Sequence, residues 1–306
     1  MILSASRRTD IPNYYSAWFL KRLEEGFVCV RNPFNPRQVS RITLSPATID
    51  CIVFWTKNPG PLLEQIDRLQ PYAYYFQFTL NPYARDIEPL VPGKATGGLD
   101  LFRRLAEIVG RERVRWRYDP VLCNDRYTVA YHLQYFGKLA ARLSGYTESC
   151  TISFLDLYRH NKNILAQRGI RTPTETERRE LAAGFALAAK AYKIKLNACA
   201  EDGDYQAFSI GRAACIDGEL IERLTGKRIP LSKDKGQRKC CGCVPSADIG
   251  AYNTCANGCL YCYAQTGKPW RQALVDSPIL GSIPDAGDII TERKGITRQI
   301  RQQQLF

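Results

Sequence analysis

The sequence predicts an α/β protein built on a six-stranded (βα)6 partial barrel of the TIM type, followed by a cysteine-rich segment. Three observations lead to this prediction. Short apolar runs alternate with longer helical patterns, polar side chains follow most of these runs, and eight of the twelve cysteines lie at or after Cys199. A chain of 306 residues is long enough for one α/β barrel with an appendage.

Six apolar runs are expected to form the parallel strands: ILSAS (2–6), CIVFWT (51–56), YYFQFTL (74–80), VRWRYD (114–119), CTISFLD (150–156) and IKLNACA (194–200). Helices are expected between them at 14–25, 60–69, 97–109, 127–143 and 174–192. Thr172 or Thr174 can cap the last helix, and the acidic residues Glu175 and Glu177 suit its positive N-terminal end.

Three regions follow from this pattern. Residues 1–200 form the partial barrel, with a β-hairpin inserted at 27–44 around two Asn-Pro turn signals. Residues 201–276 form the cysteine-rich cluster-binding segment, and residues 277–306 form a basic tail.

Polar or charged residues end nearly every expected strand. In a βα barrel the carboxyl ends of the strands meet at one mouth, so these residues could share one cavity, although strands without a site also end in polar loops. The run RVRWRYDP is more specific, because Arg115, Arg117 and Asp119 alternate onto one face while Trp116 and Tyr118 share the other.

Composition indicates a cytoplasmic protein without a membrane span or signal peptide, because no run of about 18 apolar residues appears. In a reducing compartment, twelve cysteines are better explained by metal binding than by disulfides. A net charge of +13 suits nucleic acid as a partner, but the charge is scattered without a long Lys/Arg block, which favours an ordinary solvated basic surface.

The stretch YNTCANGCLYCYAQ places Cys255, Cys259 and Cys262 at C-x3-C-x2-C spacing. A structural zinc site normally needs four thiolate or imidazole ligands, so these three leave a tetrahedron incomplete. A [4Fe–4S] cluster can take three cysteines and leave its fourth iron open to another ligand.

The motif CANGCLYCYA resembles the C-x3-C-x-aromatic-C signature of radical S-adenosylmethionine enzymes, and its YCYA ending is similar to that of the spore photoproduct lyase branch. The longer run KCCGCVPSADIGAYNTCANGCLYCYA, with NACAEDGDY and AACIDGELIERL upstream, resembles an uncharacterised bacterial family with a radical-SAM-like cysteine cluster at its C-terminus. This second resemblance extends from ILSASRRTDIP to YCYA.

The resemblance implies that Cys255, Cys259 and Cys262 bind a catalytic [4Fe–4S] cluster, with Tyr261 against the adenine of S-adenosylmethionine. It also implies cleavage of the cofactor to a 5′-deoxyadenosyl radical, driven by a one-electron donor such as flavodoxin or ferredoxin.

Two departures from radical SAM enzymes are visible. The motif follows the sixth strand rather than the first, and FWTKNPG stands where those enzymes often carry a Gly-Gly-Glu segment that holds the methionine amine. Cofactor binding would then depend on other residues, for which we expect Arg115, Arg117, Thr56 and Lys57.

Four further cysteines, Cys199, Cys215, Cys241 and Cys243, could bind a second, auxiliary iron–sulfur cluster, with zinc as the alternative metal. Family resemblance alone favours Cys241 and Cys243 over Cys240. Cys199 and Cys215 could instead be buried thiols. The remaining cysteines, Cys29, Cys51, Cys123 and Cys150, are expected in the core.

Only two histidines are present, which disfavours a histidine-based hydrolase. His132 is expected to pack inside an aromatic helix, and His160 to lie at the barrel mouth. Two hypotheses therefore remain: a radical SAM iron–sulfur enzyme with an unknown substrate, nucleic acid being the first choice, or a non-catalytic nucleic-acid-binding protein stabilised by zinc or iron–sulfur clusters. The sequence leaves the oligomeric state open.

Overall fold

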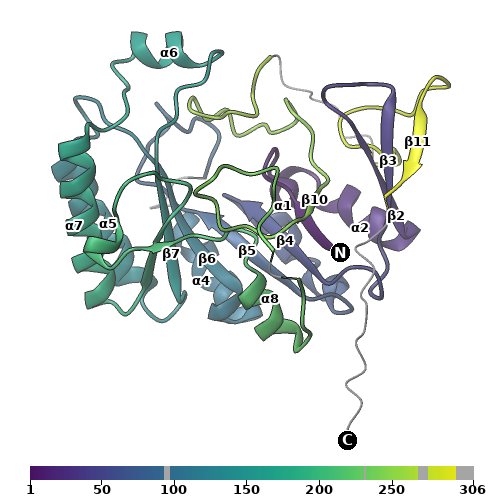
Figure 1. Ribbon diagram of the computed structural model, residues 1–306, viewed down its shortest axis with the longest axis horizontal. Helices are drawn as coiled ribbons and strands as arrows, with labels where there is room; N and C mark the ends of the chain where they lie inside the picture. Colours follow the sequence, from purple (N-terminus) through teal and green to yellow (C-terminus); the bar gives the residue numbers. More distant parts are fainter. Residues whose placement is uncertain (93–96, 231, 268–274, 294–306) are drawn as a thin grey trace, which may run out of the picture.

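A computed structural model describes residues 1–92, 97–230, 232–267 and 275–293. Its centre is a parallel sheet with the order β10-β1-β4-β5-β6-β7-β8-β9 (Figure 1). The strands are β1 (Ile2–Ala5), β4 (Cys51–Thr56), β5 (Tyr74–Thr79), β6 (Val114–Val121), β7 (Ser149–Phe154), β8 (Lys195–Ala198), β9 (Gly211–Arg212) and β10 (Ala247–Asp248).

All six expected strands are present, but the sheet has eight strands rather than six. The additional strands, β9 and β10, are two residues long and lie at the two edges. Among the described residues no pairing joins these edges, so the hydrogen-bonded order stays open. Both edge strands come from the cysteine-rich part of the chain, which therefore completes the sheet.

The helices are α1 (Ile11–Tyr14), α2 (Ser16–Glu25), α3 (Gly60–Leu63), α4 (Gly98–Val109), α5 (Val129–Leu143), α6 (Lys162–Gln167), α7 (Glu175–Ala191) and α8 (Gly218–Thr225). Short 3-10 turns occupy Ile66–Leu69, Arg111–Arg113 and Gln206–Phe208. The expected helix at 14–25 is divided at Tyr15, and the one at 60–69 is also divided into two short turns.

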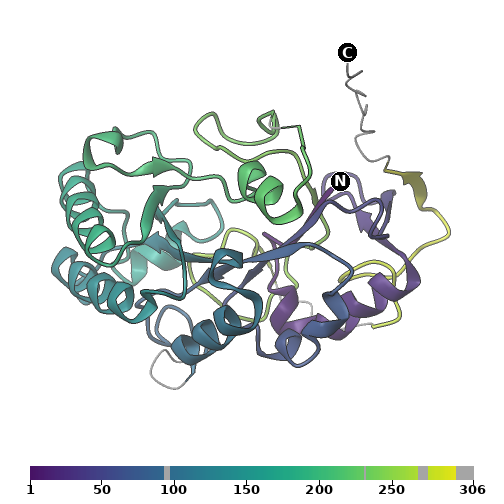
Figure 2. The same cartoon turned by 90° about the horizontal axis from the view of Figure 1, so that it is seen from below.

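The two faces of the sheet bury different partners. On β4, Ile52 and Phe54 belong to the main core, which includes apolar residues of α2, α4, α5 and α7. The alternate residues Cys51 and Val53 pack in a smaller cluster with Leu220 of α8. This alternation is the two-residue period of a strand buried on both faces, and Figure 2 shows α8 on the side of the sheet opposite α4.

The expected capping of α7 is confirmed at Thr174. Its hydroxyl accepts a hydrogen bond from the Glu177 backbone N–H, and the Glu177 side chain accepts one from the Thr174 N–H. This reciprocal capping box satisfies two backbone donors that the helix itself cannot pair.

The expected hairpin at 27–44 is confirmed as β2 (Phe27–Arg31) and β3 (Gln38–Thr43), which pair antiparallel. A late strand, β11 (Ile289–Glu292), pairs parallel with β3. It belongs to the region expected as a basic tail, of which residues 294–306 lie outside the described residues. No helix in the described parts of the chain is both long and apolar enough to cross a membrane.

Candidate functional site

A cavity of about 550 Å³ lies at the carboxyl ends of the central strands. Each of the six expected strands contributes to its wall, through Arg7 after β1, Thr56 of β4, Thr79 of β5, Arg117 of β6, Asp156 after β7 and Cys199 after β8. The expectation that the polar strand ends share one cavity is therefore confirmed. Its size is within the range of pockets that hold small ligands and cofactors.

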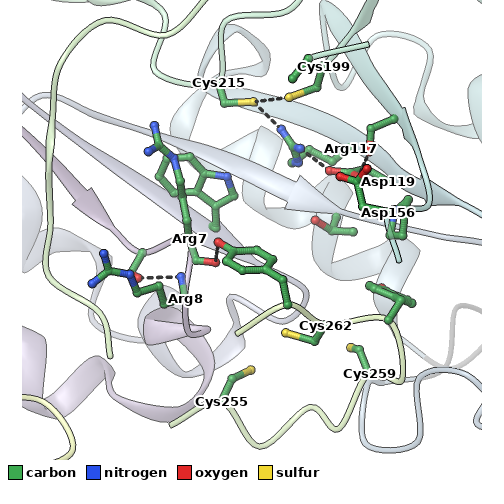
Figure 3. A pocket seen from close by; sticks show the side chains of 18 of the residues that line it. Arg7, Arg8, Arg117, Asp119, Asp156, Cys199, Cys215, Cys255, Cys259 and Cys262 are labelled. Carbon is green, nitrogen blue, oxygen red and sulfur yellow. Dashed lines mark hydrogen bonds and ion pairs between the residues drawn. The ribbon is translucent and has the colours of Figure 1, made fainter. Parts of the chain in front are cut away.

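Seven cysteines line this cavity in two groups. We call Cys255, Cys259 and Cys262 the motif group, and Cys199, Cys215, Cys241 and Cys243 the dispersed group. In Figure 3 the labelled members of the two groups lie on different sides of the cavity, with Arg7 between them.

The loop of the motif group is fixed by contacts with two other loops. The Leu260 N–H donates to the Ile87 carbonyl at 3.1 Å, and the Asn161 side chain donates to the Tyr261 carbonyl at 3.2 Å. His160 Nε2 lies 3.0 Å from the Cys262 carbonyl. His160 thus supports the backbone of the motif rather than lining the cavity.

Gly258 meets two local requirements of the motif. Its φ is +67°, a conformation that residues with a Cβ rarely adopt, and an added Cβ would lie 3.1 Å from Pro89 Cγ. Glycine at this position lets the chain turn between Cys255 and Cys259 while packing close to the loop after β5.

A buried charged network lies beside Cys259. Lys57 Nζ contacts Glu88 Oε1 at 2.9 Å, and the Tyr261 hydroxyl donates to the same oxygen at 2.5 Å. Asn81 Nδ2 also donates to Glu88, at 3.1 Å. Burial opposes the charge on Lys57, but Glu88 outweighs it and raises the pKa of Lys57, so its ammonium stays charged beside the motif group.

Asp10 connects the motif group to the start of the sheet. Its Oδ2 accepts from the Lys57 backbone N–H at 2.8 Å and from Asn257 Nδ2 at 3.2 Å. Burial raises the pKa of Asp10 despite these hydrogen bonds. Residues from positions 10, 57 and 257 are thus held together at one end of the cavity.

The motif thiols are largely withdrawn from water. Burial raises the pKa of Cys255 to about 12 and also raises the pKa values of Cys259 and Cys262. In the metal-free chain these groups are therefore thiols at neutral pH, and metal binding has to release their protons. Lys57 partly offsets this cost at Cys259, because its positive charge lowers the pKa of that thiol.

The dispersed group has a different electrostatic setting. Cys199 Sγ and Cys215 Sγ lie 3.6 Å apart, and Arg117 Nη1 donates to Cys215 Sγ at 2.8 Å. Hydrogen bonds from Cys199 and Cys243, together with the Arg117 charge, lower the pKa of Cys215 well below that of a free thiol. Arg117 also pairs with Asp119.

The expected cofactor-binding residues do not all reach the cavity. Thr56, Lys57, Arg117 and Tyr261 line it. Arg115 does not, because its Nη2 pairs with Asp217 Oδ2 at 2.5 Å, at the N-cap of α8. The expected alternation on β6 is confirmed, since Trp116 and Tyr118 pack in the main core on the opposite face.

The residues expected in the core are buried. Cys29, Cys51, Cys123 and Cys150 are buried, as expected. His132 is also buried, where Nδ1 lies 2.8 Å from the Tyr118 hydroxyl and Nε2 lies 2.7 Å from the Leu122 carbonyl. Burial lowers the pKa of His132 to about 4, so this histidine is neutral in the folded protein.

Sequence reasoning missed Glu88 and Asn257. Glu88 lies in an irregular stretch after β5 whose residues show no helical or strand periodicity, so no pattern indicated that it would meet Lys57. Asn257 stands inside the cysteine motif at a position that the spacing leaves undefined. Only the folded chain shows that it contacts Asp10.

In the described residues, no group of three or more His, Cys, Asp or Glu side chains is arranged so that it could hold a metal ion. The three motif thiols nevertheless suit an iron–sulfur cluster, in which each thiolate binds a different iron and the ligands do not share one ion. They come from one short loop and face one cavity, with a cation beside Cys259.

Comparison with known protein families shows a match over most of the chain. A family model described as a domain of unknown function (DUF1848) matches residues 2–264, which include both cysteine groups. No curated protein and no solved structure matches the chain significantly.

Proposed function

The chain belongs to the DUF1848 family, whose function is unknown, and we propose from the site itself that it is a radical S-adenosylmethionine enzyme. In this proposal Cys255, Cys259 and Cys262 hold a [4Fe–4S] cluster. The observation that carries it is the placement of these three thiols, at C-x3-C-x2-C spacing, on the wall of a strand-end cavity of cofactor size.

The bound cluster would supply one electron, taken from a flavodoxin- or ferredoxin-type donor, that breaks the C5′–S bond of S-adenosylmethionine to give methionine and a 5′-deoxyadenosyl radical. The chain's own residues would position the cofactor and keep water out. The convergence of six strand ends on one cavity supports the partial-barrel interpretation of the fold, since barrel enzymes carry their sites at this end.

Lys57 and Tyr261 would serve the motif side of the cavity. Lys57 carries a retained positive charge beside Cys259 and would partly balance the anionic cluster. The Tyr261 ring lies 5.6 Å from Lys57 Nζ, and its hydroxyl is held by Glu88. A fixed ring next to the third cysteine is suited to packing against the adenine of the cofactor.

Arg7 would bind an anionic group, such as the cofactor carboxylate or an acidic substrate. Its guanidinium lies over the Trp55 ring, 5.4 Å from the centroid, and it lines the cavity. In the described part of the chain, Arg7 Nη2 is buried and has no hydrogen-bond partner. A buried guanidinium nitrogen without a partner is costly, and an anionic ligand would satisfy it.

The test is cofactor cleavage by anaerobically reconstituted protein. The chain is incubated with S-adenosylmethionine and dithionite, and 5′-deoxyadenosine and methionine are quantified by liquid chromatography and mass spectrometry. We expect both products in equal amounts from the natural sequence and from Cys240→Ala, a cysteine outside both groups. Absence of 5′-deoxyadenosine from protein that carries its full iron and sulfide would overturn the proposal and favour the non-catalytic binding protein.

A further inference from the structure

The dispersed group brings together four cysteines from three places in the chain. Cys199 follows β8, Cys215 follows β9, and Cys241 and Cys243 lie in the segment that leads to β10. Cys215, Cys241 and Cys243 are buried. Since the thiols are free rather than joined as disulfides, their convergence at the cavity requires another explanation.

These cysteines lie close to one another in space. Cys199 and Cys215 are separated by 3.6 Å between their Sγ atoms. The Cys243 N–H donates to Cys241 Sγ at 3.5 Å. The four cysteines thus form two close pairs, Cys199 with Cys215 and Cys241 with Cys243, that line one cavity.

The spacing of the first pair suits a metal. Two thiolates on one tetrahedral ion, with metal–sulfur bonds of about 2.3 Å, lie about 3.8 Å apart. In the described structure the four thiols do not surround one point at which a metal ion could bind. Each Sγ can swing about its Cα–Cβ bond, so closure around a metal requires rotation of cysteine side chains.

Two arginines balance the charge that such a centre would carry. Four thiolates around a divalent ion leave a net charge of −2, which is costly in a buried site unless cations are near. Arg117 donates to Cys215 Sγ at 2.8 Å. Arg7 lines the same cavity as the four cysteines, and its buried Nη2 has no hydrogen-bond partner in the described part of the chain.

Backbone N–H groups also donate hydrogen bonds to sulfur atoms of the dispersed group. The Ile216 N–H donates to Cys243 Sγ at 3.3 Å, and the Cys243 N–H donates to Cys241 Sγ at 3.5 Å. Gly242 between them packs so closely that an added Cβ would lie 2.9 Å from the Ala213 carbonyl oxygen. The neighbouring Cys240 differs, because its thiol points away and donates to Asp202 Oδ1 at 2.6 Å.

From these observations we infer that Cys199, Cys215, Cys241 and Cys243 form a second metal centre with four thiolate ligands and with Arg117 and Arg7 as its counter-charges. Zinc and an auxiliary [2Fe–2S] cluster both fit this ligand set, because in each of them two thiolates share one metal ion. The centre lines the same cavity as the motif group, but it does not depend on the radical SAM proposal.

The experiment uses the full chain with the motif group removed, as Cys255→Ala/Cys259→Ala/Cys262→Ala. Zinc, iron and acid-labile sulfide are measured after anaerobic purification. We expect one centre per chain to remain, seen either as zinc alone or as iron with matching sulfide. Adding Cys199→Ala and Cys215→Ala should remove it, whereas adding Cys240→Ala should not.

A second measurement avoids variants that fail to fold. Cysteine alkylation of the natural chain is followed by mass spectrometry with and without a metal chelator. The four dispersed cysteines should become reactive only when the chelator is present, and Cys240 should react in both cases. Alkylation of the four that is indifferent to the chelator, or metal content unchanged by Cys199→Ala/Cys215→Ala, would overturn the inference. Because the motif group is absent from the first experiment, its outcome is separate from that of the cofactor-cleavage assay.

Discussion

The two cysteine groups that share the cavity differ in how the chain assembles them. The motif group comes from one stretch of eight residues, and burial raises the pKa of each of its thiols. The dispersed group comes from distant segments, and Arg117 donates a hydrogen bond to one of its sulfur atoms, Cys215 Sγ. Spacing alone singles out the motif group. The dispersed cysteines were also expected to act together, but only the fold shows that they converge on one cavity.

The difference matters for the roles that we assign. Three ligands from one loop would leave a cluster iron open for a cofactor, while four ligands with two nearby arginines would close a centre and balance its charge.

Replacing Cys259 with Ala should reduce 5′-deoxyadenosine formation to the background level, because the cluster would lose one of its three protein ligands. The measurement is product formation per reconstituted chain, together with iron content. Far-ultraviolet circular dichroism should stay unchanged, since Cys259 lies in a loop outside the helices and strands. Unfolding of the C-terminal region by this substitution would instead indicate a structural metal.

Replacing Lys57 with Met should lower the free energy of unfolding of the metal-free chain by about 3 kcal/mol, because it removes one partner from a buried ion pair. Lys57 contacts Glu88, whose side chain is 2% exposed. Urea unfolding monitored by fluorescence measures the effect. Lys227→Met, at an exposed position, is the control and should change stability by less than about 0.5 kcal/mol. Equal effects of the two substitutions would show that the charged network beside Cys259 is not a stabilising unit.

Acid should destabilise the core through His132, and this effect has to be separated from acid release of metal. The pKa of His132 falls from 6.5 to about 4 on folding. The unfolded chain therefore binds a proton that the folded chain does not, and stability falls as pH drops from about 6.5 to about 4. The expected contribution is about 3 kcal/mol.

The variant His132→Gln removes this titration. Urea unfolding of the metal-free chain at pH 7 and pH 4 should show a smaller loss of stability for the variant than for the natural chain. If the natural chain and the variant lose the same stability, the pH dependence arises from groups other than His132. Metal loss at low pH can then be compared between the two cysteine groups without subtracting a contribution from His132.

The N-cap of α7 lies far from both cysteine groups, and substitutions there give a reference value for small changes in the free energy of unfolding. Thr174→Ala should cost about 1 kcal/mol, because it removes the hydroxyl that accepts from the Glu177 N–H. Thr172→Ala, the other candidate cap, should cost less. Thermal unfolding measures both. A larger effect at Thr172 would mean that the capping box does not stabilise the helix start.

Much of the fold could be predicted because its strands are continuous apolar runs and its helices are periodic. The edge strands β9 and β10 could not, because two residues leave no periodic pattern. They pair with β8 and β1 through contacts that the folded sheet provides. The sequence also gave no reason for Arg115 to pair with Asp217 instead of facing the cavity.

The site was predictable to the extent that its chemistry is local. Spacing singled out Cys255, Cys259 and Cys262, and alternation on β6 singled out the face of Arg117; all four residues line the cavity. The contacts of Glu88 with Lys57 and Tyr261 depend on an irregular loop, so no pattern predicts them. Hydrogen bonding between Cys199 and Cys215 likewise depends on how β8 and β9 end.

The central claim is that the motif group holds a cluster with an iron open to S-adenosylmethionine. The most direct test is the electron paramagnetic resonance spectrum of the reduced Cys199→Ala/Cys215→Ala variant, reconstituted anaerobically and recorded with and without the cofactor. The account predicts a [4Fe–4S] signal whose g values shift when S-adenosylmethionine is added. A cluster signal indifferent to the cofactor, or zinc in place of iron at the motif group, would contradict it.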